Sequence, residues 1–216
     1  KGAWIYFRSI YTNIIDNNLI WLNNTLTQID TILWVTPLNK NLNDSYEIYL
    51  WTKNSQLKTD AEYIFNDVKL LYDWLAADTS YKTNNDALTK VFDKNLSLLK
   101  KTIALCDKVN VVLDNSSTSS DFLQSDINGL KQSITTYQNS LLQLQWQMIA
   151  LNNSLSTQRV SIDTNIKSLQ SAIDIAQKQL DNAYQNVENI KANNSSNIQN
   201  LSWNESLLKV QLESTI

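Results

Sequence analysis

Hydrophobic residues recur every three or four positions along most of the chain, and short polar stretches interrupt the pattern. This spacing is typical of amphipathic α-helices. It predicts three helices of similar length, over residues 3–35, 44–77 and 86–113, and a longer helical stretch from about residue 120. Thr36-Pro37 ends the first helix, because a proline disfavours helical geometry in the residue before it. The connectors are short, so we expect antiparallel neighbours.

An apolar residue occupies every seventh position of the fourth stretch. The ten positions are Ile127, Ile134, Leu141, Met148, Leu155, Ile162, Leu169, Ala176, Ala183 and Ile190. Such a repeat predicts a coiled-coil seam. The companion apolar residue lies three positions later as far as Leu151 but four positions later from Ile166, so the buried face rotates near Gln158. An unbroken helix over residues 120–192, with Ser119 or Ser120 as its N-cap, would be roughly 110 Å long. A break at residues 152–156 is the alternative.

Residue size changes near residue 157. Six of the seven Trp residues lie before this point, and large aromatic side chains suit the wide core of a bundle. Beyond it, Ala176 and Ala183 lie in the seam, where small residues let two helices approach closely. We therefore predict an all-α fold, an elongated antiparallel bundle with a long coiled-coil helix. Its parts are a four-helix bundle over 1–157, with the fourth helix at 120–157, and a coiled-coil hairpin over 158–216, with helices at 158–192 and 197–216.

The composition excludes several classes of function. The 216 residues include 18 Lys and Arg against 21 Asp and Glu, a net charge of −3, which offers no basic surface for nucleic-acid phosphates. No run of about 18 apolar residues predicts a membrane span. Because the chain has no His and a single Cys, it lacks the residues of a Ser-His-Asp site and of common metal sites. We predict no enzyme activity, no catalytic, cofactor-binding or metal-binding residues, and no nucleic-acid partner.

Five residues are of types that could carry chemistry, and each also has a structural explanation. Asp181 and Glu188 fit the solvated face of a helix, and Cys106 lies on an apolar stripe as a small buried hydrophobe. Gly129 either permits close approach of a neighbour or is tolerated near a helix start. Arg159 is either a surface residue or a hydrogen-bonding group beside the rotated seam. An enzyme with an unfamiliar carboxylate site remains an alternative that requires a concave pocket with perturbed acids.

Residues 161–216 resemble the α-helical hairpin of HlyD-type periplasmic adaptors, also called membrane fusion proteins. The resemblance lies in the phrases SLQSAIDIAQKQLDNAYQNVENI and SLLKVQLESTI. In this family the returning hairpin helix passes directly into a strand of a lipoyl-like domain, so we expect a short β segment after Ile216. The upstream phrases WLNNTLTQIDTILW and LTKVFDKNLSLLKKTIALCDKV are similar to the enlarged helical insert of some bacterial adaptor subunits.

The resemblance implies a periplasmic spacer and docking domain of an efflux or secretion transporter, anchored to the inner membrane by a segment before Lys1. Its implied partners are other copies of itself and the inner-membrane transporter, with an outer channel as a further contact. The chain departs from the family at the hairpin-tip pattern R-x-x-x-L-x-x-x-x-x-x-S. Asp163 stands four residues after Arg159, and Thr12 four residues after Arg8. No site residue is therefore transferred from the family.

A helical pore-forming toxin, or another membrane-active helical bundle, is the alternative function. That class would also be long and poor in His, but it needs an apolar segment able to enter lipid. The nearest candidate, residues 105–113, is interrupted by Asp107, Lys108 and Asn110. The adaptor is therefore the leading hypothesis.

Overall fold

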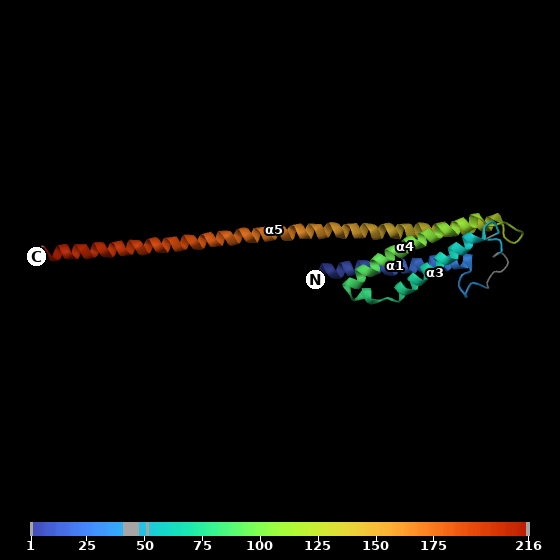
Figure 1. Ribbon diagram of the computed structural model, residues 1–216, viewed down its shortest axis with the longest axis horizontal. Helices are drawn as coiled ribbons and strands as arrows, with labels where there is room; N and C mark the ends of the chain where they lie inside the picture. Colours follow the sequence, from blue (N-terminus) through green and yellow to red (C-terminus); the bar gives the residue numbers. More distant parts are fainter. Residues whose placement is uncertain (1, 41–47, 51, 215–216) are drawn as a thin grey trace. The chain divides into compact units, whose positions relative to one another are not determined.

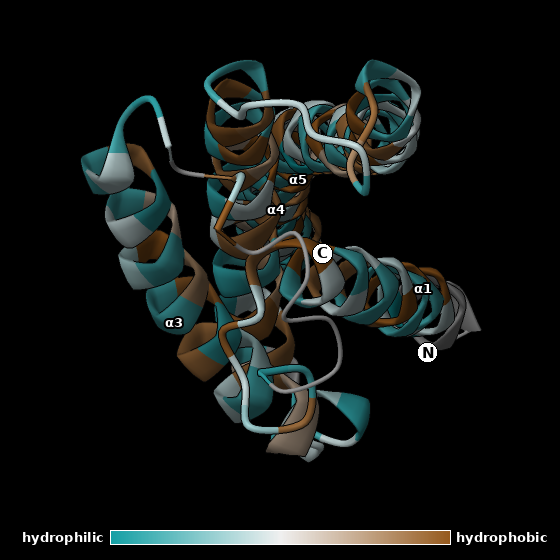
Figure 2. Ribbon diagram, turned by 90° about the vertical axis from the view of Figure 1, so that its right-hand side faces the viewer, coloured by the Kyte–Doolittle hydropathy of each residue, from teal (hydrophilic) through white to brown (hydrophobic). Residues whose placement is uncertain are grey.

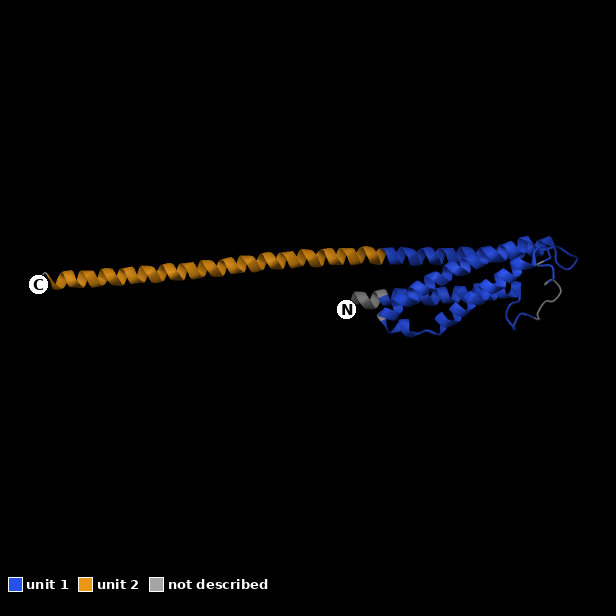
Figure 3. Ribbon diagram, viewed as in Figure 1, with its two compact units in different colours: residues 1–153 blue, residues 154–216 orange. Residues whose placement is uncertain are grey.

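The computed structural model describes residues 2–40, 48–50 and 52–214, and within these ranges the regular elements are helices, with no strand. They are α1 (Gly2–Leu33), α3 (Ser55–Ala77), the 3-10 helix η1 (Ser80–Lys82), α4 (Asn85–Asp114) and α5 (Gln124–Glu213) (Figure 1). The predicted all-α class, a helical bundle with a long C-terminal helix, is confirmed. The chain divides into two compact units, residues 1–153 and residues 154–216 (Figure 3).

In the first unit, α1, α3, α4 and the beginning of α5 run alternately in opposite directions (Figure 1). α4 packs against both α1 and α3, and Figure 2, which looks along the helices, shows hydrophobic residues where α3 and α4 face each other. The first rungs of the predicted heptad repeat are buried in α5 at Ile127, Ile134, Leu141 and Met148. Burial of these seven-spaced side chains fixes which face of α5 joins the bundle.

Helix α1 ends at Leu33, two residues before the predicted end. The Asp30 carboxylate is buried, and its Oδ1 accepts hydrogen bonds from the backbone N–H groups of Val35 (3.0 Å) and Thr36 (2.8 Å). Trp34 adopts a left-handed conformation (φ 51°) that turns the chain out of the helix. A short acidic side chain thus competes for backbone donors and stops the helix before Pro37.

Helix α3 begins at Ser55, so the prediction of a helix from residue 44 is wrong for the described residues 48–50 and 52–54; residues 44–47 lie outside the described ones. Asn54 is the N-cap, with its Oδ1 accepting from the Gln56 N–H at 3.1 Å. The preceding connector is held by tertiary hydrogen bonds, from the Ser116 hydroxyl to the Leu50 carbonyl (3.3 Å) and from the Ser117 N–H to the Tyr49 carbonyl (2.9 Å). These partners are remote in sequence, which is why periodicity missed them.

Helix α4 starts at Asn85, one residue from the prediction, because the Asn84 side chain caps it by accepting from the Asp86 N–H at 2.9 Å. Helix α5 starts later than predicted. The Ser119 hydroxyl does accept from the N–H groups of Asp121 (3.2 Å) and Phe122 (3.1 Å), but it forms a turn that buries the Phe122 ring, and α5 begins at Gln124.

The predicted hairpin over 158–216 is wrong. α5 is one helix of 90 residues that continues through residues 193–196, where a turn was expected, and through residues 152–156, the alternative break. The returning helix over 197–216 is instead a continuation of α5 as far as Glu213, and residues 215 and 216 lie outside the described ones. Asn and Ser are poor helix formers but do not forbid helical geometry, whereas no Gly or Pro is present there to end it.

Candidate interaction surface

The second unit exposes a continuous apolar stripe along α5. Every residue from Ser156 to Ser214 is exposed. Nine of them follow one another in alternating steps of four and three, and we call these nine the seam: Ile162, Ile166, Leu169, Ile173, Ala176, Leu180, Ala183, Val187 and Ile190. A stripe with this spacing is the buried surface of a coiled coil, here without cover from the described residues.

The large seam side chains are exposed to an unusual degree for aliphatic residues. Their exposed fractions run from 48% at Val187 to 65% at Leu169. A contiguous exposed apolar surface of this kind marks a site of interaction with a protein or a membrane. The a positions of the heptads hold Ile166, Ile173, Leu180 and Val187. Three of these four residues are β-branched, and a single apolar stripe of this kind is the surface that a partner helix covers in a coiled coil.

Charged residues lie beside and behind the seam. Asp174, Asp181 and Glu188 repeat every seven residues at one heptad position on the polar side. Asp174 accepts from the Gln170 amide (3.2 Å) and Asp181 from the Gln177 amide (3.3 Å), each one turn earlier on the same helix. The interpretation of Asp181 and Glu188 as residues of a solvated face agrees with their exposure. α5 is therefore amphipathic in the second unit although it has no cover there.

The apolar face continues past the expected turn. Ile198 lies eight residues after Ile190, with Asn194 on the same face between them, and Leu201, Leu208 and Leu212 follow. Two successive four-residue steps replace the regular alternation, a feature known as a stutter. The pattern over residues 193–196, which predicts a turn, is instead a change in the phase of the apolar stripe within one continuous helix.

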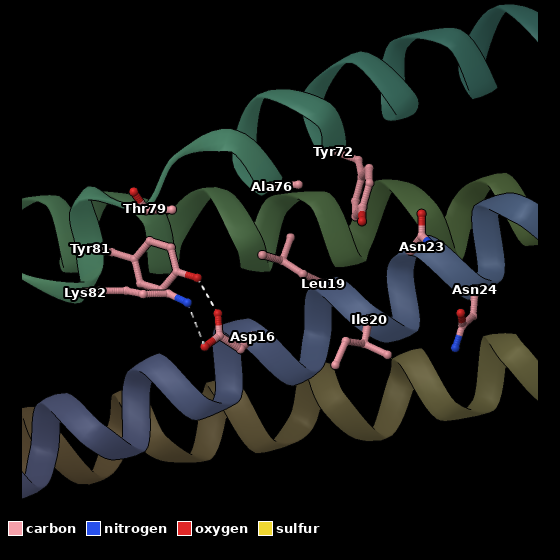
Figure 4. Close-up of a pocket in the computed structure, with 10 residues that line it drawn as sticks. All are labelled: Asp16, Leu19, Ile20, Asn23, Asn24, Tyr72, Ala76, Thr79, Tyr81 and Lys82. Carbon is pink, nitrogen blue, oxygen red and sulfur yellow. Dashed lines mark hydrogen bonds and ion pairs between the residues drawn. The ribbon is translucent and has the colours of Figure 1, made fainter.

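The first unit has an open groove between α1 and the α3–η1 region, with a volume of about 300 Å³ (Figure 4). At one end the Tyr81 hydroxyl donates a hydrogen bond to the Asp16 Oδ1, and the Lys82 Nζ lies 3.3 Å from the Asp16 Oδ2. Leu19, Ile20 and Tyr72 line the rest. The charged pair and the tyrosine join η1 to α1.

The pKa values of the two groove tyrosines are raised, by different causes. Burial and then the hydrogen bond to Asp16 raise the pKa of Tyr81. Burial is also the main cause for Tyr72, whose pKa is raised despite the opposing effect of Lys69. Both phenols therefore keep their protons at neutral pH, so neither acts as a base there. The contacts of Asp16 with Tyr81 and Lys82 make this end of the groove a junction between η1 and α1.

The remaining residues considered for chemistry have structural explanations. Cys106 is fully buried, and burial, with a smaller contribution from Asp107, raises the pKa of its thiol to about 12. The prediction of a small buried hydrophobe is confirmed. A Cβ on Gly129 would meet nothing within 4 Å, so this glycine is tolerated rather than needed for a close approach. Arg159 is exposed.

A buried polar pair was not anticipated. Asn18 and Asn95 are both fully buried, and the Asn18 Nδ2 lies 2.8 Å from the Asn95 Oδ1 and 3.0 Å from the Met148 Sδ. The available signal was that Asn18 stands on the apolar stripe between Ile15 and Leu22. The pair joins α1, α4 and α5 inside the first unit.

Neither a cluster of metal-binding side chains nor a membrane-spanning helix occurs among the described residues. No group of three or more His, Cys, Asp or Glu side chains able to hold a metal ion occurs among them. None of the helices in the described ranges has both the length and the hydropathy needed to span a bilayer.

Comparison of the chain with models of protein families, with curated proteins and with solved structures found no match. Among the described residues, the seam of the second unit is the longest exposed apolar stripe and the leading candidate for an interaction surface.

Proposed function

We propose that this chain is a non-enzymatic spacer and docking domain of a periplasmic adaptor, or membrane fusion, subunit that serves an efflux or secretion transporter. The observation that carries the proposal is the exposed seam, from Ile162 to Ile190, on an uncovered helix. The 60 helical residues of the second unit extend roughly 90 Å at 1.5 Å per residue. A helix of that length can act as a spacer, and its apolar stripe can bind a partner along its side.

The described residues contain no returning helix, and in this respect the chain differs from the hairpin of HlyD-type adaptors. In HlyD-type adaptors the two helices of the hairpin cover each other's apolar stripes. Here the stripe is uncovered by the described residues, so the helix that covers it lies outside them. The first unit is a four-helix bundle with a core of buried apolar side chains.

The proposal is tested with the full-length gene product in cells that encode it. Ile166→Asp with Ile173→Asp places two charges in the seam, and Ser171→Asp with Gln185→Asp places the same two charges on the opposite face. After cross-linking in cells and detergent extraction, we expect an integral membrane transporter and further copies of the chain to co-purify with the wild type. The seam variant should lose at least tenfold of this material, and the opposite-face variant should retain it.

Two results would overturn the proposal. One is equal recovery of the transporter with both variants, which would show that the seam is not the docking surface. The other is leakage from liposomes treated with the purified chain, which would favour the membrane-active alternative.

A further inference from the structure

The spacing of the seam-face positions along the second unit, twelve of them apolar and two of them polar (Gln158 and Asn194), reads the same in both directions. We call the following fourteen residues the extended seam: Leu155, Gln158, Ile162, Ile166, Leu169, Ile173, Ala176, Leu180, Ala183, Val187, Ile190, Asn194, Ile198 and Leu201. The steps between them are 3, 4, 4, 3, 4, 3, 4, 3, 4, 3, 4, 4 and 3. The series is a palindrome centred on Lys178, and the two stutters lie at equal distances from that centre.

We propose that the seam is covered by the same segment of a second copy of this chain, antiparallel to the first, with the twofold axis at Lys178. This inference rests on the proposed docking role of the seam and names the partner and its register. A stutter changes the phase of the apolar stripe, so two helices stay in contact only where their stutters coincide. An antiparallel pair centred on Lys178 brings each stutter opposite the other.

The residue sizes fit this register. It places Leu180 opposite Ala176 of the second copy, and Ile173 opposite Ala183 of the second copy. Each small residue thus faces a large one, which fills the layers of a core evenly. A parallel pair in register would instead place each alanine opposite itself and leave two layers underfilled.

The charges beside the seam favour the same register. Asp163 and Lys191 both occupy the e position, where antiparallel helices face each other, and the register brings them together at both ends of the pair. The Lys191 side chain is exposed, and its Nζ lies 2.7 Å from the Glu188 Oε1 on the same helix. Because it is not buried, it can turn toward Asp163 of the second copy without disturbing a core. A shift by one heptad would place Lys191 opposite Gln170 or Ser156 of the second copy, and neither of these side chains is charged.

A hairpin within one chain would produce the same pairing if it turned at Lys178. α5 is helical through this point, and its centre, Ala176-Gln177-Lys178-Gln179-Leu180, consists of good helix formers without Gly or Pro. The described residues therefore do not supply the second helix by folding back at this point.

The test uses single cysteines in the full chain with a short bis-maleimide cross-linker. Gln177→Cys and Gln179→Cys each lie next to their own counterpart across the twofold axis, whereas Lys178→Cys is the matched control on the outer face. Cys106 is buried in the first unit, so the wild-type chain serves as the blank. We expect covalent dimers from both glutamine positions, at least tenfold more than from Lys178→Cys.

A second test exchanges the charges. Asp163→Lys or Lys191→Asp alone sets like charges against each other, and we expect each to weaken the dimer roughly three- to tenfold in sedimentation. The double variant Asp163→Lys/Lys191→Asp restores opposite charges and should recover wild-type dimerisation.

Three results would overturn the register. The first is a yield of cross-linked dimer from Lys178→Cys equal to that from the glutamine positions. The second is cross-linking of Ala183→Cys to its own counterpart without cross-linking at Gln177→Cys, which indicates a parallel pair. The third is a chain that stays monomeric and forms no cross-linked dimer. The proposed docking role fails separately, when the seam and opposite-face aspartate variants recover the same membrane partners.

Discussion

The carboxamides of Asn18 on α1 and Asn95 on α4 meet at 2.8 Å in the centre of the four-helix bundle, with both side chains fully buried. The bond satisfies one polar atom of each residue. The Asn18 Oδ1 and the Asn95 Nδ2 have no hydrogen-bond partner among the residues that the structure describes. A buried polar layer of this kind costs stability, because an unsatisfied polar atom has lost its water without a replacement.

Replacing the pair should give strongly non-additive stabilities. Asn18→Leu or Asn95→Leu alone leaves the other amide without its partner, and we expect each to lower the free energy of unfolding by about 1–3 kcal/mol. The double variant removes both amides and should be at least as stable as the wild type. Urea unfolding of all four proteins measures the coupling, and additive losses would contradict the prediction.

Gly129→Ala should stabilise the first unit. Gly129 is an exposed helical residue, and an added Cβ meets nothing within 4 Å. Alanine restricts the unfolded chain more than glycine, so we expect a gain of about 0.5–1 kcal/mol in the free energy of unfolding. Thermal unfolding tests this, with the exposed Gln132→Ala on the same helix as the control. A loss of stability would indicate that α5 needs the glycine for a close approach.

Alkaline pH should destabilise the bundle through Cys106. The ordinary pKa of its thiol is 9.0, and burial raises the folded-state pKa to about 12. Both states hold the proton below pH 9, so the stability is fully present there. Between pH 9 and about 12 the unfolded state releases the proton first, and stability falls as the pH rises, by about 1.4 kcal/mol per pH unit from this group.

The Cys106→Val variant should remove this contribution. Its free energy of unfolding should fall less steeply than that of the wild type above pH 9, as measured by denaturant titrations at several pH values. Val109→Ala removes buried apolar volume but no titratable group, and it should keep the wild-type slope. Equal slopes for wild type and Cys106→Val would show that the thiol is not the source.

Hydrogen exchange should depend on protein concentration in the second unit only. Residues 154–213 form a helix with no buried side chain, and an isolated helix is marginally stable in water. Pairing of the seam should slow amide exchange there as the concentration rises, while residues 124–153, whose seven-spaced side chains are buried, exchange slowly throughout. Slow exchange of residues 154–213 at the lowest concentration would contradict this.

Local chemistry explains which helix boundaries could be predicted. The end of α3 at Ala77 and the start of α4 at Asn85 follow from nearby capping residues, and both were placed within one residue. The start of α3 was missed although Asn54 caps it locally, because the conformation of residues 49 and 50 before it depends on hydrogen bonds from the remote Ser116 and Ser117. The Asn18–Asn95 pair was missed for the same reason, since the two residues lie 77 positions apart.

By itself, the sequence determined the helical class, the bundle and the apolar repeat, because each depends on the spacing of side chains along one helix. Only the tertiary structure decided that α5 continues through residues 193–196 and leaves its seam uncovered. An apolar stripe indicates that another surface covers the helix, but it does not indicate which one. A turn and a stutter both interrupt the heptad pattern in the same way, so the spacing of side chains alone cannot distinguish a hairpin from one continuous helix.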